Sequence, residues 1–226
     1  MWVRLTPPFS STRAQPGRNF GNDLPVLKPR DIQQTGISKV LVMRRTLVFA
    51  LVGTLASCLA AAALPEGAKA PDFTTQASLG GKPFQFALAD ALKKGPVVLY
   101  FYPAAFTPGC TKEAHDFAEA TDKFKSMGAT VIGVSYDNID TLNKFSVSEC
   151  RNKFAVASDS DQKIMKAYDA VLTGKPEWAN RTSYVISPAG EILYSYTDLK
   201  PDKHVENTMA AVQKWADSHQ KGHKPS

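Results

Sequence analysis

The sequence predicts an α/β domain with a mixed central sheet that is covered by helices on both faces. Two segments, 97–102 and 130–135, are continuous runs of apolar and β-branched residues, typical of strands buried on both faces. Each is followed by a segment with helical spacing, and a hairpin and a helix close the chain. Such alternation of strands and helices is typical of layered α/β folds.

The first half of the domain contains the longest of these elements. A short strand is expected at 83–88, and the 97–102 strand lies between Gly95-Pro96 and Pro103. A helix over 110–126 has Phe117, Ala120, Phe124 and Met127 along one stripe and ends at Gly128.

In the second half, shorter elements are predicted. We expect a helix at 139–153, a strand at 154–157, a helix at 162–168, a loop at 172–180 and a hairpin of strands 183–187 and 191–196. An amphipathic helix over 202–218 would turn Val205, Met209, Val212 and Trp215 inward.

Length and charge limit the function classes. The 226 residues suffice for one domain and a tail. The net charge of +6 falls entirely on residues 1–63, because residues 64–226 carry equal numbers of basic and acidic side chains. The domain is therefore not expected to bind nucleic acid.

The N-terminal residues indicate export. Met43-Arg44-Arg45, an apolar run over 46–56 and small residues up to Ala63 form the pattern of a secretory signal peptide. We expect residues 43–63 to be the signal peptide, 64–226 the mature domain, and 1–42 a non-native or untranslated extension. The apolar run is too short to span a membrane, so a bacterial periplasmic location is expected.

A second interpretation of the leader is open. Leu55-Ala56-Ser57-Cys58 resembles a bacterial lipobox, in which the cysteine is lipidated and becomes the new N-terminus. In that case Cys58 would carry a lipid anchor in place of cleavage after Ala63. The mass of the mature N-terminus distinguishes the two.

One segment carries reactive chemistry. Pro103-Ala104-Ala105-Phe106-Thr107-Pro108-Gly109-Cys110 joins a buried strand to the start of a long helix. Unpaired N–H groups and the positive end of the helix dipole favour a thiolate there, and the thiolate is the nucleophilic form of cysteine. The prolines stiffen the loop, and Thr107 can hydrogen-bond a peroxide or the sulfur. The alternative is a buried structural cysteine.

This segment resembles the peroxiredoxin signature Pro-x-x-x-Thr/Ser-x-x-Cys at all three anchor positions. Thr107–Ala114 is similar to the subgroup called bacterioferritin comigratory protein or peroxiredoxin Q, and the resemblance extends over 70–215. It implies a thioredoxin-like fold and a thiol-dependent peroxidase that needs no metal or organic cofactor. It also favours a monomer or weak homodimer.

By matching position, the resemblance assigns roles to five residues. Cys110 would be the peroxidatic cysteine, which peroxide oxidises to a sulfenic acid. Thr107 would orient the peroxide and Pro103 would shield the thiolate from water. Arg181 would stabilise the thiolate and the leaving oxygen, and Glu113 would hold that arginine. The alternatives are a solvated charge at a strand end for Arg181 and an ordinary surface role for Glu113.

The sequence departs from the subgroup at the second cysteine. Many members have a resolving cysteine five residues after the first, where this chain has His115. Cys150, on the helix predicted at 139–153, is the other cysteine of the mature domain. It would form an intramolecular disulfide with Cys110 after local unfolding, for which Ser148 and Asn152 make that helix end a weak point. Alternatively, Cys150 is only buried and an external thiol completes the cycle.

The histidines are given no catalytic role. His115 lies about 140° around the helix from Cys110, so a surface or packing role is expected. His204, His219 and His223 lack metal-ligand spacing.

We therefore expect an enzyme that reduces hydrogen peroxide and organic hydroperoxides and is recycled by a thioredoxin-type donor. One alternative, an exported thiol–disulfide oxidoreductase, is disfavoured because the chain has no Cys-x-x-Cys motif. The other, a non-catalytic thioredoxin-fold binding module, is disfavoured by the complete Pro–Thr–Cys–Arg set.

Overall fold

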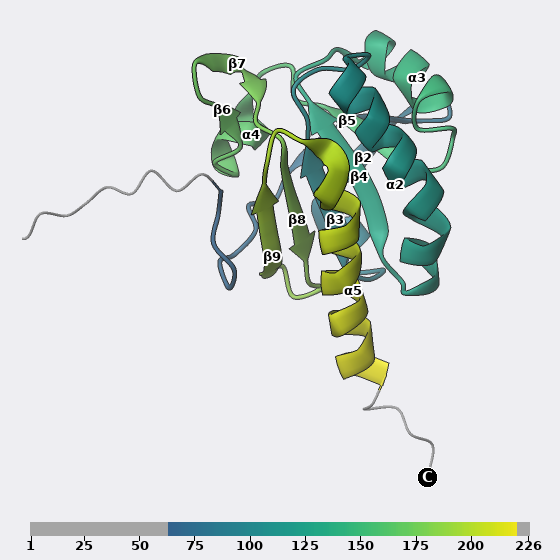
Figure 1. The fold of residues 1–226 in the computed structure, drawn as a ribbon, viewed down its shortest axis with the longest axis vertical. Coiled ribbons are helices and arrows are strands. Elements are labelled where there is room, and N and C mark those ends of the chain that lie inside the picture. Colours follow the sequence, from purple (N-terminus) through teal and green to yellow (C-terminus); the bar gives the residue numbers. More distant parts are fainter. Residues whose placement is uncertain (1–62, 221–226) are drawn as a thin grey trace, which may run out of the picture. The chain divides into compact units, whose positions relative to one another are not determined.

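The computed structural model describes residues 63–220, which form a seven-stranded mixed sheet with helices on both faces (Figure 1). The strand order is β2-β1-β5-β4-β3-β8-β9, with β3, β4 and β5 parallel and the flanking pairs antiparallel. The strands are β1 (Thr74–Leu79), β2 (Lys82–Ala87), β3 (Val97–Phe101), β4 (Thr130–Ser135), β5 (Ala155–Ser158), β8 (Thr182–Ile186) and β9 (Ile192–Thr197). This arrangement confirms the predicted fold class.

The helices divide between the two faces of the sheet. They are α1 (Leu88–Leu92), α2 (Pro108–Ser126), α3 (Ile139–Ser148), α4 (Lys163–Ala167) and α5 (His204–Gln220), with a 3₁₀ turn, η1 (Pro201–Lys203), before the last. Buried residues of α2, α3 and α5 join one core, and those of α1 and α4 join the other. Among residues 63–220, no helix is long and apolar enough to cross a membrane.

The central strand β3 is apolar throughout because it faces both cores. Val98 and Tyr100 point to the α2 side, and Val97, Leu99 and Phe101 point to the other.

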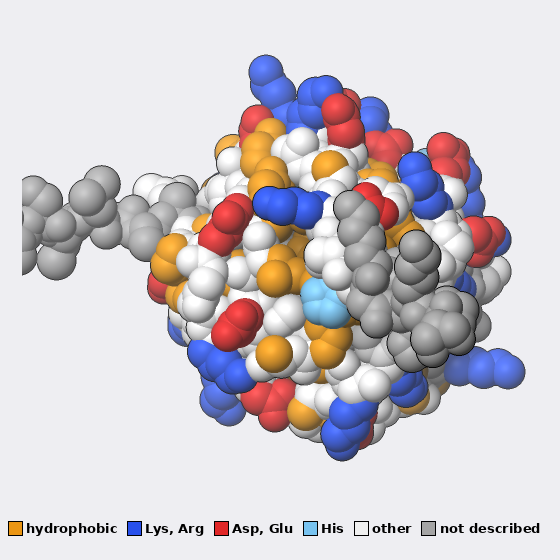
Figure 2. Space-filling model, turned by 90° about the horizontal axis from the view of Figure 1, so that it is seen from below, with side chains coloured by type: hydrophobic (Ala, Val, Ile, Leu, Met, Phe, Trp, Pro, Cys, Tyr) orange, Lys and Arg blue, Asp and Glu red, His pale blue; other side chains and the backbone are white. Residues whose placement is uncertain are grey.

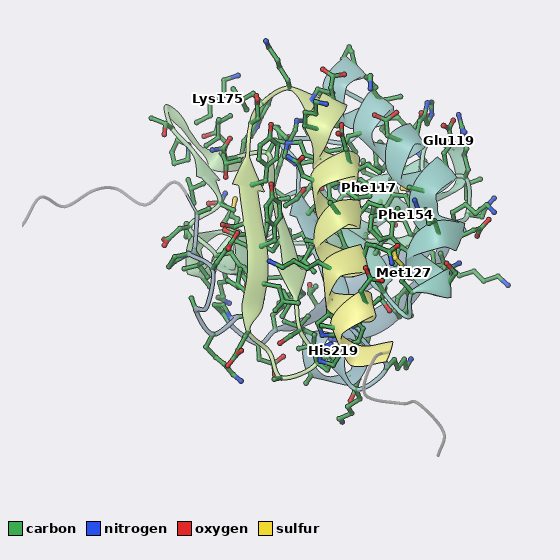
Figure 3. The ribbon with its side chains drawn as sticks, turned by 60° about the horizontal axis from the view of Figure 1, so that its bottom comes forward. Phe117, Glu119, Met127, Phe154, Lys175 and His219 are labelled. Atoms are coloured by element: carbon green, nitrogen blue, oxygen red, sulfur yellow. The ribbon has the colours of Figure 1, made fainter. Side chains whose placement is uncertain are left out.

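Aromatic rings pack tightly between β3 and α2. The Tyr100 ring stacks on Phe117, with 4.3 Å between centroids. Phe117 also meets Phe154 edge-on beneath α2 (Figure 3). A Cβ on Gly133 would lie 2.7 Å from Tyr100 Cζ, so a glycine is required on the neighbouring strand.

Three expectations about local structure are wrong. The segment 172–180 is not a loop: β6 (Val171–Leu172) and β7 (Lys175–Ala179) form a separate antiparallel hairpin. Trp178 of β7 stacks on Tyr136, and the Lys175 ammonium lies 4.2 Å from the Trp178 ring centroid. The tertiary contact with Tyr136 helps to stabilise a strand that its proline and charges do not predict. In addition, β1 and α1 were not anticipated.

The helix predicted over 139–153 is also shorter than expected. It ends at Ser148 because the chain turns sharply afterwards, with left-handed φ values of +49° at Arg151 and +60° at Asn152. Cys150 therefore lies in a turn and not on a helix, contrary to the prediction.

The inward face of the last helix is rotated from its predicted position. His204, Thr208, Val212 and Ala216 are buried at a spacing of four residues, whereas Val205, Met209 and Trp215 are only half-buried. Of the predicted stripe, Val212 alone is fully buried.

Charges of both signs are mixed on the surface. Seen from below, basic and acidic side chains alternate around the rim of the molecule (Figure 2). This face shows no patch of one sign, in keeping with the charge balance of the mature domain. The predicted extension and signal peptide, including Cys58, lie outside the described residues apart from Ala63, so the division into 1–42, 43–63 and 64–226 stays a prediction.

Candidate functional site

Cys110 is the third residue of α2 and only 2% exposed. Pro108 begins the helix, a position where a missing N–H costs nothing. Cys110 therefore lies in the first helical turn, where backbone N–H groups and the helix dipole favour an anion. The expected placement of the thiol at a helix start is confirmed.

The loop before α2 is fixed by polar contacts. The Ala105 amide donates to Asp137 Oδ2 over 2.8 Å, and Ser135 Oγ donates to the same oxygen over 2.8 Å. Phe106 adopts a left-handed φ of +63° and packs edge-on against Phe145. Sequence reasoning did not identify Asp137, although a carboxylate just after a buried strand was a usable signal.

Thr107 and Pro103 flank the sulfur in this loop. Pro103 is buried and Thr107 half-buried. The Thr107 hydroxyl donates to the Ala104 carbonyl over 3.0 Å. Because its proton is engaged there, the hydroxyl oxygen is free to accept a hydrogen bond from a hydroperoxide O–H.

Arg181 is brought to the sulfur by strand pairing. β8 pairs antiparallel with β3, with Thr182 opposite Phe101, so Arg181 lies at the end of β3 from which the loop leads to Cys110. Its Nη2 donates to Cys110 Sγ over 3.4 Å, and its Nε donates to the Leu199 carbonyl over 2.9 Å. A Cβ at Gly109 would lie 3.1 Å from Nη2, so a small residue is favoured there. Arg181 is 4% exposed and is not a solvated strand-end charge.

Glu113 anchors the same arginine from α2. Its Oε2 accepts a hydrogen bond from Arg181 Nη1, and the side chain is fully buried. The alternative of a surface role is therefore wrong, because this position of α2 faces the core, where Glu113 meets Arg181. Burial raises the pKa of Glu113 to about 8, and the Arg181 charge opposes that rise.

Cys150 is buried in the same core as Cys110. Its side chain is 0% exposed, and its amide donates to the Phe145 carbonyl over 3.1 Å. Burial, with a smaller contribution from Glu149, raises the pKa of its thiol well above the ordinary value. Tyr100 and Tyr102 lie in the same core, within electrostatic reach of both sulfurs.

Polar pairs fasten the turn that holds Cys150 to α2. We call residues 149–153 the Cys150 turn. His115 Nε2 lies 2.9 Å from Glu149 Oε2, Glu119 pairs with Arg151 at 3.1 Å, and Asp122 pairs with Lys153 at 2.8 Å. His115 thus lies half-buried against this turn. Figure 3 shows Glu119 on the outer side of α2.

One further site residue was missed. His204 is fully buried, with Nδ1 3.7 Å from Glu113 Oε1 and 2.8 Å from Ser183 Oγ. The signal that could have found it is the four-residue spacing of His204, Thr208 and Val212 on one face of the last helix.

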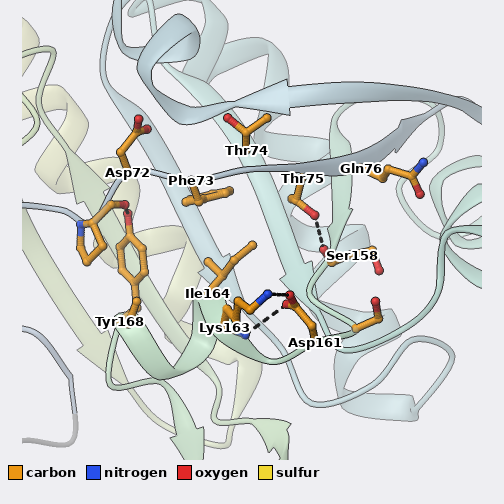
Figure 4. A pocket seen from close by; sticks show the side chains of 13 residues that line it. Asp72, Phe73, Thr74, Thr75, Gln76, Ser158, Asp161, Lys163, Ile164 and Tyr168 are labelled. Carbon is orange, nitrogen blue, oxygen red and sulfur yellow. Dashed lines mark hydrogen bonds and ion pairs between the residues drawn. The ribbon is translucent and has the colours of Figure 1, made fainter.

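A pocket in the described residues lies away from Cys110. A pocket of about 530 Å³ between β1 and α4 is lined by residues such as Asp72, Thr75 and Lys163 (Figure 4), and none of its lining residues contacts Cys110. Within residues 63–220, no cluster of three or more His, Cys, Asp or Glu side chains could hold a metal.

The site can be compared with known proteins. Residues 67–195 match the model of the AhpC/TSA family. The chain belongs to the AhpC/TSA peroxiredoxin family. Among peroxiredoxins it is 34% identical over 149 residues to "Peroxiredoxin Q, chloroplastic" of Oryza sativa subsp. japonica, which covers 66% of this chain and 66% of the relative.

Bacterial members of the peroxiredoxin family are also similar. "Putative peroxiredoxin bcp" of Helicobacter pylori strain J99 is 34% identical over 154 residues, covering 66% of this chain and 98% of the relative. Among solved structures, peroxidoxin BcpB of Mycobacterium tuberculosis superposes with a TM-score of 0.59 at 30% identity, covering 67% of this chain and 97% of that one. Peroxiredoxin Q of Xanthomonas campestris gives 0.55 at 30% identity, with coverages of 62% and 90%.

Proposed function

We propose that this peroxiredoxin reduces hydrogen peroxide and organic hydroperoxides with the Cys110 thiolate as nucleophile. The observation that carries the proposal is the contact of Arg181 Nη2 with Cys110 Sγ at 3.4 Å, in the first turn of α2. A guanidinium and a helix N-terminus both stabilise an anionic sulfur. The same groups can stabilise the oxygen that leaves.

The first step follows from this geometry. The thiolate attacks the distal oxygen of ROOH, an S–O bond forms, the O–O bond breaks, and the alkoxide takes a proton to leave as ROH. Thr107 accepts the peroxide O–H while it donates to Ala104. Arg181 compensates the developing negative charge, and buried Pro103 limits access of water to the sulfur.

We infer that Cys150 completes the cycle. Its thiol would attack the Cys110 sulfenic acid, forming the S–S bond and releasing water. Cys150 shares a core with Cys110 but is fully buried. Both thiols are free and buried in this structure, and a disulfide between them would need Cα atoms about 4.4–6.8 Å apart. We propose that the Cys150 turn opens to bring the two sulfurs together. The ion pairs that Arg151 and Lys153 of this turn make with α2 are exposed and contribute little stability, and Arg151 and Asn152 have left-handed φ values, so the turn is a weakly held segment.

The remaining parts of the proposal concern partners and location. A thioredoxin-type donor would reduce the disulfide and restore both thiols. The leader pattern supports export to a bacterial periplasm, and subgroup similarity supports a monomer or weak homodimer. A lipid anchor at Cys58 is the alternative to signal-peptide cleavage.

Peroxide consumption by wild type and Cys110→Ser tests the proposed function. We expect the variant to lose all enzymatic consumption. Insulin reduction without peroxide turnover would contradict it and indicate a thiol–disulfide oxidoreductase, and inactivity in both assays would indicate a binding module.

Peptide mass spectrometry of peroxide-treated wild type tests the role of Cys150. We expect a Cys110–Cys150 disulfide peptide. Detection of only Cys110 sulfenic acid, or of an adduct with an external thiol, would reject the resolving role and leave the one-cysteine alternative.

A further inference from the structure

A chain of buried polar groups extends behind Arg181, away from the sulfur. It runs from Glu113 to His204 and Ser183, and all three side chains are 0% exposed. Arg181 contacts Glu113 through Oε2 only, and the other carboxyl oxygen, Oε1, has no hydrogen-bond partner. Unpaired buried polar atoms are costly, so this oxygen requires an explanation.

The protonation of His204 follows from its neighbours. Its Nε2 lies 2.9 Å from the Asp198 carbonyl oxygen, which can only accept, so Nε2 carries a proton. Burial lowers the pKa of His204 to about 4, so the ring is neutral and Nδ1 is an acceptor. Ser183 Oγ donates to Nδ1 over 2.8 Å.

Glu113 Oε1 therefore faces an acceptor. The 3.7 Å separation from Nδ1 offers no donor to an ionised carboxylate, because this nitrogen is an acceptor that already takes the Ser183 hydroxyl proton. Protonation of Oε1 would remove the negative charge from an oxygen that has no donor. Burial with no donor to Oε1 favours the neutral carboxyl, while the contact of Arg181 with Oε2 opposes it. The raised pKa of Glu113, about 8, agrees with this geometry.

The protonation of Glu113 sets the net charge that it forms with Cys110 and Arg181. With Cys110 as a thiolate, sulfur and Arg181 cancel, and an ionised Glu113 would leave a buried excess of negative charge. Once the sulfur becomes an uncharged sulfenic acid, Arg181 needs another anion. Glu113, already in contact with Nη1, is placed to become that anion.

We propose that Glu113 is the proton store of the site: it carries a proton on Oε1, facing His204, while Cys110 is a thiolate, and releases it when the sulfur is oxidised. The inference rests on the proposed peroxidase function. In balance, Cys110–S⁻ + ROOH + Glu113–COOH gives Cys110–SOH + ROH + Glu113–COO⁻. Sulfur loses two electrons, the peroxide gains them, and the charge beside Arg181 is unchanged. The balance does not require contact between Glu113 and the alkoxide.

Charged or titratable groups near Glu113 come from several elements. They are Lys112 and Asp116 on its own helix, Tyr100 on β3, Arg181 before β8 and His204 on α5. Lys112 pairs at the surface with Asp116 at 2.7 Å and Asp202 at 3.2 Å. Of these groups, Arg181 is the one that contacts both Glu113 and the sulfur, so it couples the two.

Carboxyl ¹³C NMR tests the proposal without peroxide. The full chain is labelled with ¹³C-glutamate and kept reduced, and the Glu113 signal is assigned by its loss in Glu113→Gln. We expect a titration midpoint near 8 in wild type. In Cys110→Ser, which lacks the thiolate, the midpoint should fall by about one to three pH units, the size typical of a nearby charge. Cys110→Ala serves as a second variant if the serine protein does not fold.

Cys150→Ser is the matched control, because it makes the same substitution at the other buried thiol and should leave the midpoint unchanged. A Glu113 midpoint below pH 5 in reduced wild type, or one equal in wild type and Cys110→Ser, would overturn the proposal. Peroxide consumption is measured separately on the same samples. If Cys110→Ser still consumes peroxide at the wild-type rate, the proposed function fails, whatever the NMR result.

Discussion

The His115–Glu149 pair should control how often Cys150 becomes accessible. Of the pairs that fasten the Cys150 turn to α2, it is the most protected from solvent, with side-chain exposures of 35% and 18%. Removing one such partly exposed pair should destabilise the closed form of the turn by about 0.5–1 kcal/mol. In His115→Ala the equilibrium constant for opening the turn should therefore rise roughly two- to fivefold. His115 occupies the position where many members of the similar subgroup have their resolving cysteine. The prediction therefore also tests whether the residue at this position now holds the Cys150 turn closed.

Thiol labelling measures this opening directly. In a Cys110→Ser background, excess maleimide is added and the labelled Cys150 peptide is quantified by mass spectrometry over time. We expect His115→Ala to accelerate labelling two- to fivefold by the same estimate. Asp116→Ala is the control, because it removes an ion pair with Lys112 on the same helix without touching the turn. Equal rates in His115→Ala and its parent, or equal acceleration by Asp116→Ala, would refute the reasoning.

Three further predictions concern other parts of the molecule. Thr107→Val removes the hydroxyl that we propose accepts the peroxide O–H, and should lower kcat/KM about 10- to 100-fold, a loss of about 1.4–3 kcal/mol. Stopped-flow kinetics should show recovery in Thr107→Ser, and unchanged kcat/KM in Thr107→Val would contradict the role. Gly133→Ala places a Cβ 2.7 Å from Tyr100 Cζ and should lower the free energy of unfolding by about 1–3 kcal/mol in urea melts; full stability would mean that the ring can move. Burial lowers the pKa of His204 from 6.5 to about 4, so the unfolded chain binds this proton more readily. The stability that His204 contributes is complete above pH 6.5 and is lost as pH falls toward 4. Urea melts of His204→Phe should show a flatter acid limb than wild type, and parallel limbs would be the contrary result.

Local patterns predicted the central strands and the nucleophile well. The apolar runs of β3 and β4 are continuous because both faces of these strands are buried, and the Pro103–Cys110 segment is a contiguous motif. Prediction was poorer where tertiary contacts override local preference. β7 exists because Trp178 stacks on Tyr136, far away in sequence, and α3 stops early because Arg151 and Asn152 turn left-handed.

The sequence by itself determined the family resemblance, the position of the reactive thiol at a helix start and the α/β class, because each depends on residues close together in the chain. Tertiary structure decided which distant groups surround that thiol. The antiparallel register of β8 on β3 brings Arg181 to Cys110 across 71 positions. Packing of α5 against α2 buries His204 beside Glu113. Burial and long-range register set the charges of this site, and neither is contained in any local segment.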